Sequence, residues 1–432
     1  MAALRGLLQR PLASYYLLLA CVGLLLVIGL VMVFSATSLT SYTDTGNAFA
    51  DVLKQGTFAL IGFVAFWFCQ RLPVRTFRGI AKPAIIIAFL LMFLVDALGF
   101  AAVLAATPGE TPEPIHLGPV HASQLWLHLG PVQLQPAEPA KLALVLWGAQ
   151  VLVTKGPAIA NLRDLMTPLF PVTFALFGLV GYNDLGSMLC LLVAFVGLLW
   201  AAGVRLRVFL GMFVVALAGV IGLILMPGKH FYRVERLVVF FDPSRADRAD
   251  GAYQYFQGLY AVAEGGWFGV GLGEGHLKWG RLPNGHNDFI FAVIAEELGV
   301  MGCLVVLGLF AVLAYTGLRI ARRVADPFRR LVAASITIWF VGQAVINIGG
   351  VVGLLPITGL PLPFISDGGT ALVVALTAAG ILLSFARAEP DAARALHARP
   401  PRRWVRLVWA PLPPLPRSRP DHERAPKTGR SG

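Results

Sequence analysis

The stretch from Ser14 to Ala36, SYYLLLACVGLLLVIGLVMVFSA, contains no charged residue. A helix of about 20 apolar residues is long enough to cross the hydrocarbon core of a bilayer. Because lipid offers the backbone no hydrogen-bond partners, a run of this kind must be helical. The run is too long for the apolar part of a signal peptide, and no small-residue cleavage pattern follows it. It therefore predicts a membrane-spanning helix.

Comparable apolar runs recur along the chain, which is 57% hydrophobic and 13% charged, whereas soluble domains are about 25% charged. The runs lack the alternation of apolar and polar residues that marks a membrane β-barrel. The sequence therefore predicts an all-α integral membrane protein with about ten transmembrane helices. We expect them at residues 14–36, 55–71, 82–104, 140–154, 166–182, 186–203, 207–226, 288–317, 331–353 and 369–387.

Lysine and arginine gather in alternate loops, and an excess of these residues marks the cytoplasmic side. Segment 105–139, by contrast, has neither residue and carries Glu110, Glu113 and Glu138. This pattern predicts that both termini are cytoplasmic. The loops assigned to the cytoplasm contain Arg71, Arg75, Arg78, Lys82, Lys155, Arg163, Arg205, Arg207, Arg319, Arg322, Arg323, Arg329 and Arg330.

Three regions are expected to be non-helical. Segment 105–139 is an outer loop, and 227–287 is a large extracytoplasmic loop between helices 7 and 8, rich in Tyr and Trp, which suits a cap at the membrane interface. Segment 354–368, LLPITGLPLPFISDG, has too many Pro and Gly residues for a helix but is too apolar for a free loop. We expect it to be extended backbone buried in protein or lining a cavity.

The chain therefore divides into a cytoplasmic N-terminal segment (1–13), a polytopic membrane domain (14–387) and a cytoplasmic tail (388–432). From Glu389 on, the tail has ten Lys or Arg and four Asp or Glu, a net charge of +6. Its composition, basic and rich in proline, predicts disorder. RRWVRLVW, Arg402 to Trp409, combines cations with tryptophan and suits an anionic lipid surface. A division protein is another candidate partner for the tail, whereas no folded module indicates nucleic-acid binding.

Asp288, in GHNDFIFAVIAEELG, lies where the large outer loop meets an apolar helix. One interpretation is an N-cap, because Asp is a preferred capping residue and its charge suits the positive helix end. The other is a functional carboxylate at the boundary between water and lipid. The spacing alone leaves both open.

Other candidates are charged or amide side chains near the outer face. Glu138 and Lys141 are three residues apart, on one helix face, and form either a local ion pair or a buried pair facing a cavity. Gln343 and Asn347 are four apart and suit bonds between helices. A phosphate-bearing lipid would need charge-assisted partners, although for any one of these cations an ordinary solvated charge is the favoured interpretation. The outer cations are Lys54, Arg233, Arg236, Lys278 and Arg281.

Several motifs together resemble the SEDS family (shape, elongation, division and sporulation), in particular its cell-division branch, and the basic, proline-rich tail resembles that of the actinobacterial type. They are GLVMVFSATS near the first helix, WLHLGPVQLQPAEPAKL (Trp126 to Leu142), GAYQYFQGLYAVAEGGWFGVGLG, LPNGHNDFIFAVIAEELG and INIGGVVGLLPITGLPLPFISDGG. The resemblance runs from about Ser14 to Arg387. The chain departs from the family pattern at Asn284, where a Glu is usual, and at Asp367, where a Tyr is usual.

The resemblance implies a peptidoglycan glycosyltransferase at the division septum. Its substrate would be lipid II, an undecaprenyl-pyrophosphate-linked disaccharide peptide. An inverting displacement would form β-1,4-linked glycan on the outer face of the cytoplasmic membrane. Asp288 matches the essential Asp of the family and would be the catalytic base. Substrate binding would fall to residues of the matching motifs and the outer cations, namely Glu138, Lys141, Arg236, Lys278, His286, Asn347 and Ser366.

No metal ligand is assigned, although the pyrophosphate would call for cations or a divalent ion such as Mg²⁺. The implied partners are a class B penicillin-binding protein, a transpeptidase, and other proteins of the division machinery. Two alternatives have the same topology. A lipid II flippase should show paired repeats and ionisable groups at the membrane midplane, and no repeat is evident. A division scaffold without catalytic activity would not need Asp288 or Lys141.

Overall fold

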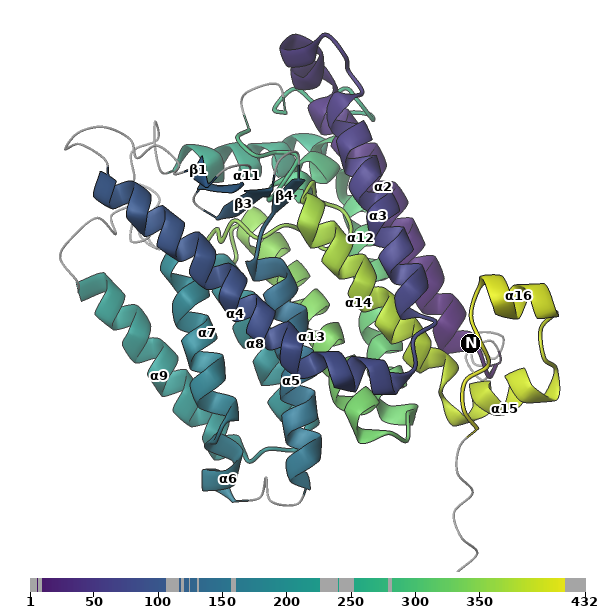
Figure 1. The fold of residues 1–432 in the computed structure, drawn as a ribbon. Helices are drawn as coiled ribbons and strands as arrows, with labels where there is room; N and C mark the ends of the chain where they lie inside the picture. Colours follow the sequence, from purple (N-terminus) through teal and green to yellow (C-terminus); the bar gives the residue numbers. More distant parts are fainter. Residues whose placement is uncertain are drawn as a thin grey trace, which may run out of the picture.

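A computed structural model describes residues 6, 10–105, 116–117, 120–123, 125–129, 132–156, 161–225, 240, 252–278 and 282–415. Within them, long helices form a bundle with a small sheet at one end (Figure 1). The long helices are α2 (Ala13–Thr45), α3 (Ala50–Cys69), α4 (Val74–Ala105), α5 (Ala137–Lys155), α7 (Leu169–Asn183), α8 (Leu185–Ala201), α9 (Leu206–Leu225), α12 (Ile290–Arg323), α13 (Pro327–Val351) and α14 (Gly369–Arg387). Every expected span overlaps one of them.

By length and composition, seven helical stretches among the described residues could cross a membrane. α8 and the first part of α9 are apolar but shorter. α5 carries Glu138, Lys141 and Lys155 and is preceded in the chain by the sheet. The expectation of a multi-pass helical membrane protein is thus confirmed, while the number of crossings and the side of each loop stay predictions.

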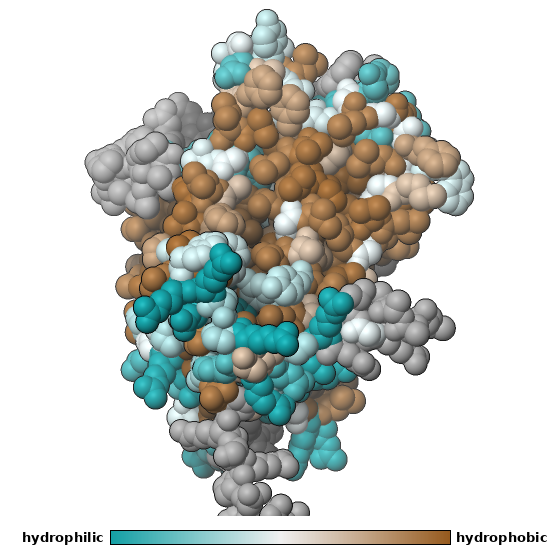
Figure 2. Space-filling model, turned by 90° about the vertical axis from the view of Figure 1, so that its right-hand side faces the viewer, coloured by the Kyte–Doolittle hydropathy of each residue, from teal (hydrophilic) through white to brown (hydrophobic). Residues whose placement is uncertain are grey.

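The helices differ in how deeply they are buried. Of the apolar stretch in each of α13 and α14, 72% is buried, against 22% in α3. α13 packs on α8 and α12, and α14 packs on α3. The peripheral helices expose large apolar side chains such as Leu60 and Phe93, and Figure 2 shows a broad apolar face of this kind. Such a surface suits contact with lipid, because acyl chains are as apolar as leucine.

α12 is interrupted at Gly299, whose φ of 65° and ψ of −164° are not helical. Residues 266–271 run across the break. Val270 N–H donates to the carbonyl oxygen of Glu296, and Val300 N–H donates to that of Gly266. A Cβ on Gly269 would lie 2.1 Å from the carbonyl oxygen of Glu297, so the approach requires glycine. The large loop is thereby tied to the helix that follows it.

A buried ion pair reinforces this connection. Lys278 Nζ lies 2.5 Å from a carboxylate oxygen of Glu297, and the lysine side chain is 2% exposed. Ser35 of α2 donates its hydroxyl to the same carboxylate at 2.7 Å, and Gly273 N–H donates to it at 3.2 Å. Three separate segments therefore meet at one carboxylate. A charge buried this deeply must be paired and hydrogen-bonded.

Ser35→Ala should lower the stability of the folded protein, because it removes a hydroxyl donor from the buried Glu297 carboxylate. A hydrogen bond to a charged group is worth about 1.5–3 kcal/mol. We expect a lower thermal unfolding midpoint in detergent. The matched control is Thr43→Ala, in the same helix, since its exposed hydroxyl bonds only the carbonyl of Thr40. Equal midpoints for the two variants would contradict the role given to Ser35.

The segment before α5, predicted to be an outer loop, contains strands, which the all-α expectation missed. They are β1 (His116–Leu117), β2 (Val120–Ser123), β3 (Trp126–Leu129) and β4 (Val132–Leu134), in an antiparallel sheet of order β1-β2-β3-β4. Ala122 and Leu127 pack on Val95 and Leu98 of α4. Strands of two to four residues give too short an alternation of apolar and polar residues to be recognised in the sequence.

Two further expectations need correction. Segment 227–287, expected to lack helices, contains α11 (Tyr253–Gly265); residues 226–239, 241–251 and 279–281 lie outside the described part. The tail, expected to be disordered from residue 388, forms α15 (Pro390–Ala398) and α16 (Arg403–Val408). It folds because it packs on the ends of other helices, which composition does not reveal. Residues 416–432 lie outside the described chain.

Labelling of single cysteines tests the predicted topology. In a variant without the four natural cysteines, Asp44→Cys and Tyr260→Cys should react with an impermeant reagent added to the outside of cells. Arg75→Cys and Ala325→Cys should react only after the membrane is opened. All four positions are exposed, so burial would not explain a failure to react. One reversed position would contradict the alternation of Lys and Arg on which the topology rests.

Candidate functional site

Asp288 lies two residues before α12 and is 6% exposed. The helix cap position is Phe289, one residue after Asp288, and the Phe289 side chain makes no capping bond. The interpretation of Asp288 as an N-cap is therefore wrong. The backbone around it is fixed from α13, because Asn347 Nδ2 donates to the carbonyl oxygens of both Asp288 and Leu360 at 2.7 Å.

The loop of residues 354–368 holds the same stretch from the other side. Ser366 Oγ donates to the carbonyl oxygen of Asn287 and accepts from Leu362 N–H, both at 2.7 Å. Asp367 N–H donates to the carbonyl oxygen of His286 at 3.0 Å. The loop is neither helix nor strand and buries several side chains, Ser366 included, so its predicted burial is confirmed. Its backbone is not extended throughout, because residues 363–365 form a turn in which Ser366 N–H donates to the carbonyl oxygen of Leu362. The backbone at residues 286–288 is thus supported by two segments, α13 and the 354–368 loop.

Two residues near the site have left-handed backbone conformations. Asn284 has φ of 55° and Phe364 has φ of 67°. Asparagine adopts this region readily, whereas a bulky residue there is strained. Phe364 is held by its surroundings: its ring packs edge-on against Phe340 at 5.0 Å, and a Cβ on Gly29 would lie 2.6 Å from its carbonyl oxygen. Strain of this kind gathers at functional sites.

Glu138 and Lys141 form a buried ion pair in the first turns of α5. Lys141 Nζ lies 2.7 Å from Glu138 Oε1, and the lysine and glutamate side chains are 0% and 2% exposed. The ammonium also lies 3.5 Å from Gln343 Oε1 and over the ring of Trp339, 5.4 Å from its centroid. Of the two interpretations left open by the sequence, the structure supports the buried pair.

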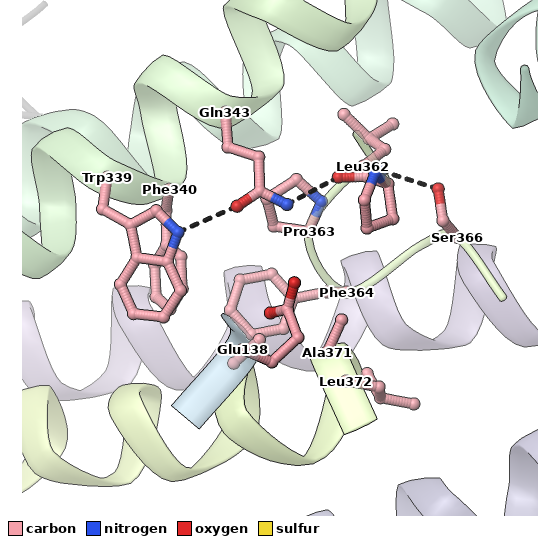
Figure 3. A pocket seen from close by; sticks show the side chains of 12 residues that line it. Glu138, Trp339, Phe340, Gln343, Leu362, Pro363, Phe364, Ser366, Ala371 and Leu372 are labelled. Carbon is pink, nitrogen blue, oxygen red and sulfur yellow. Dashed lines mark hydrogen bonds between the residues drawn. The ribbon is translucent and has the colours of Figure 1, made fainter. Parts of the chain in front are cut away.

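A small pocket connects this ion pair with the 354–368 loop. It is lined by Glu138, by Trp339 and Gln343 of α13, and by Phe364 and Ser366 of the loop. Figure 3 shows the Glu138 carboxylate directed into the pocket, with Trp339 donating to Gln343 and Leu362 donating to Ser366. The pocket lies near the start of α5, because Glu138 of its first turn lines it. The sheet is close by, since Thr370 Oγ1 at the start of α14 donates to the carbonyl oxygen of Gln133 in β4.

Asp367 lies on the rim of this region, in the loop outside the spans. Burial raises the pKa of its carboxyl, while the nearby charges of His286 and Lys54 act to lower it. The side chains of His286 and Asp367 therefore lie close enough to interact electrostatically. His286 belongs to a matching motif, and Asp367 is a departure from the family pattern.

The structure brings together most of the residues expected to form the site. His286, Asp288, Asn347 and Ser366 share the backbone contacts described above, and Gln343 joins them to Glu138 and Lys141. Lys278 is an exception. It is buried against Glu297, which is nine residues along the chain from Asp288 and roughly 13 Å along a helix, so its ammonium is not free to bind a phosphate. Arg236 lies outside the described residues.

Gln343 is a central residue that the sequence interpretation left out of the site. Its Oε1 accepts from Trp339 Nε1 at 2.8 Å, and its Nε2 donates to the carbonyl oxygen of Pro361 at 2.7 Å. Its spacing of four from Asn347 was the available signal, since both amides lie on one face of α13 and hold the same loop. Gln55 of α3 adds a third amide, donating to the carbonyl oxygen of Ser366 at 3.0 Å.

Buried polar groups in a multi-pass helical bundle mark functional pathways or sites. The fold and the site therefore define a polytopic membrane protein with a polar site at one end of the bundle. The sequence model of the cell cycle proteins FtsW, RodA and SpoVE matches residues 15–390. The chain belongs to this family.

Individual relatives agree with this family assignment. The chain is 42% identical over 409 residues to the probable peptidoglycan glycosyltransferase FtsW of Mycobacterium tuberculosis, covering 94% of this chain and 74% of the relative. It is 34% identical to stage V sporulation protein E of Bacillus subtilis, covering 84% and 94%.

Solved structures agree with the fold. One from a peptidoglycan synthase complex that coordinates polymerization and crosslinking matches with a TM-score of 0.65 and 26% identity, covering 86% of this chain and 97% of that one. The rod shape determining protein RodA of Thermus thermophilus, at 24% identity and a TM-score of 0.58, shares the fold over 86% and 96% of the two chains.

Proposed function

We propose that the protein is a peptidoglycan glycosyltransferase that polymerises lipid II into β-1,4-linked glycan on the outer face of the cytoplasmic membrane, at the division septum. Its mycobacterial relative carries that activity in its name. The higher identity to this FtsW than to the sporulation relative favours a division role over a sporulation role. The polar site at one end of the bundle suits a membrane-anchored substrate whose reacting sugars lie outside the lipid.

The chemistry requires one displacement at an anomeric carbon. The 4-hydroxyl of the acceptor sugar attacks the donor sugar, a new C–O bond forms, and the bond to pyrophosphate breaks. Undecaprenyl pyrophosphate leaves with the bonding electrons. Inversion in a single step calls for a base that takes the hydroxyl proton, and inverting glycosidases use a carboxylate in this role. Asp288 is our candidate for the base.

The position of Asp288 is the observation that carries the proposal. Its carboxyl group lies just before α12 on a backbone that Asn347 and Ser366 hold through bonds of 2.7 Å. Support of this kind fixes the position of a reacting group through its backbone. A well-fixed catalytic group is the main contribution of a protein to a displacement of this type.

Binding of the negatively charged pyrophosphate would require positive charge, from basic side chains or from a divalent metal ion. Among the described residues, no group of three or more His, Cys, Asp or Glu side chains could hold a metal ion. A divalent ion such as Mg²⁺ commonly takes one or two carboxylates and fills its other positions with phosphate oxygens and water. Asp288 or Asp367 could supply such a carboxylate. Glu138 and Lys141 we assign to shaping the pocket wall.

Purified protein incubated with lipid II separates the three candidate functions. Glycan chains indicate a polymerase. Movement of lipid II across a vesicle bilayer without glycan indicates a flippase, and neither product indicates a scaffold. We expect glycan.

The partner we propose is a class B penicillin-binding protein, because the matched structure comes from a complex that coordinates polymerization with crosslinking. α11 and residues 266–271, which are hydrogen-bonded to α12, form an ordered surface on the predicted outer side. This surface suits binding of the partner's extracytoplasmic domain. The two proteins should copurify, and the partner should raise the polymerase rate. A partner that copurifies but leaves the rate unchanged would contradict the second expectation.

A further inference from the structure

Residues 388–415 form a strap that packs on neighbouring helix ends. Trp409 Nε1 donates to the hydroxyl of Tyr15 in α2. Trp67 of α3 donates to the carbonyl oxygen of Val408 at 2.7 Å, and Arg71 donates to the same oxygen at 2.8 Å. These bonds place α16 at the ends of α2 and α3 (Figure 1).

The outward face of α16 combines large apolar side chains with cations. Trp404 is 62% exposed and Leu407 is 71% exposed. They lie three residues apart and therefore share a helix face. Arg402 and Arg403 are exposed beside them. Within a water-soluble surface the apolar pair would have no role, whereas tryptophan and leucine flanked by arginines are typical of segments lying in the interface of a membrane.

The position of α16 along the bundle agrees with such an interface. α3 exposes Leu60, Phe63 and Phe68 along its length and ends at Cys69. The bonds from Trp67 and Arg71 therefore hold α16 where the lipid-facing surface of α3 stops. In Figure 2 the apolar face gives way, on the side where α15 and α16 lie, to a hydrophilic band. Interfacial tryptophan and arginine mark this boundary.

We propose that α16 is a binding element for anionic phospholipids, with Arg402, Arg403 and Arg406 contacting headgroup phosphates and Trp404 and Leu407 entering the upper acyl region. The leaflet is the one at the ends of α2 and α3, cytoplasmic in the predicted topology. Charge complementarity selects this occupant: the part of the tail from Glu389 on carries +6, and basic residues next to a membrane are attracted by its negative lipids. The proposal does not depend on the enzymatic activity.

The test uses the full chain in nanodiscs of phosphatidylcholine, alone or mixed with phosphatidylglycerol. Hydrogen exchange of amides 402–409 should be slower in the mixed lipid, and salt should reduce the difference because it screens charge. Mass spectrometry of the intact complex should show phosphatidylglycerol retained over phosphatidylcholine. Identical exchange in both lipids would overturn the proposal, as would protection of α16 that appears only after an acidic soluble protein is added.

Single variants locate the effect. Arg403→Gln should reduce the retained phosphatidylglycerol roughly fivefold, the change expected for one basic residue at a membrane surface. Trp404→Ala should restore fast exchange without unfolding the strap, because its side chain is exposed. Arg394→Gln is the matched control, since that arginine lies in α15 and pairs with Asp391 at 2.7 Å. Equal losses from Arg394→Gln and Arg403→Gln would indicate nonspecific attraction by the charged tail and refute a site on α16.

Discussion

Asp288→Asn should abolish most polymerisation of lipid II while leaving the protein folded. Asparagine is nearly isosteric with aspartate but cannot accept the proton of an attacking hydroxyl. Loss of general-base catalysis alone should reduce the rate roughly 10²–10⁴-fold. The measurement is the initial rate of glycan formation by the purified protein at saturating lipid II. Membrane insertion and the thermal unfolding midpoint should stay close to the unmodified values.

The controls for this prediction separate catalysis from structure. The cap position of α12 is Phe289, so a changed helix start does not explain a loss of activity. Asp44→Asn makes the same chemical change at an exposed position at the end of α2, and it should leave the rate unchanged. A folded Asp288→Asn protein that polymerises at the unmodified rate would remove Asp288 from the reaction. The polymerase assignment itself would survive that result, because it is tested by the glycan product.

The bundle was predictable because apolar runs and the charges between them specify spanning helices directly. The errors occur where polar residues continue a helix. α2 extends to Thr45, well beyond the predicted end at residue 36. Threonine hydroxyls near its end bond within the helix, as where Thr37 donates to the carbonyl oxygen of Val33 at 2.8 Å and Thr45 to that of Ser41 at 2.7 Å. Back-bonding of this kind gives polar side chains a partner within the helix, so the polar residues after 36 did not mark its end.

The candidate site was predictable only in part. Motif resemblance selected Asp288, Asn347 and Ser366, and the structure places all three around one stretch of backbone. It gave no sign that Lys278 pairs with Glu297, because that pair is buried only where the loop folds back on α12 and where Ser35 of α2 packs against it, 262 residues from Glu297 in the chain. Long-range pairing of this kind depends on how the helices pack. The tail was predicted to be disordered for the same reason. Its order depends on contacts with distant helices, such as those of Trp409 with Tyr15 and of Val408 with Arg71, which composition does not reveal.

Lys141→Met should destabilise the protein severely. Methionine fills a similar volume, but the Glu138 carboxylate would then remain buried without its cation. Breaking a buried ion pair by removing one partner costs roughly 3–5 kcal/mol. We expect a large fall in the thermal unfolding midpoint and a low yield from membranes. This single variant therefore does not distinguish a structural lysine from one that contacts the substrate.

The double variant Glu138→Gln with Lys141→Met makes that distinction. It leaves no uncompensated charge, and replacing both partners of a buried pair by neutral groups is often neutral for stability. The unfolding midpoint should therefore recover, while Gln343 keeps its bonds to Trp339 and Pro361. If the pair only shapes the pocket wall, polymerisation should recover along with stability. If Lys141 contacts the pyrophosphate, a stable double variant should remain inactive. We expect recovery of both, because Lys141 is wholly buried and bonded to Glu138 at 2.7 Å; a stable but inactive double variant would make the lysine a substrate ligand instead.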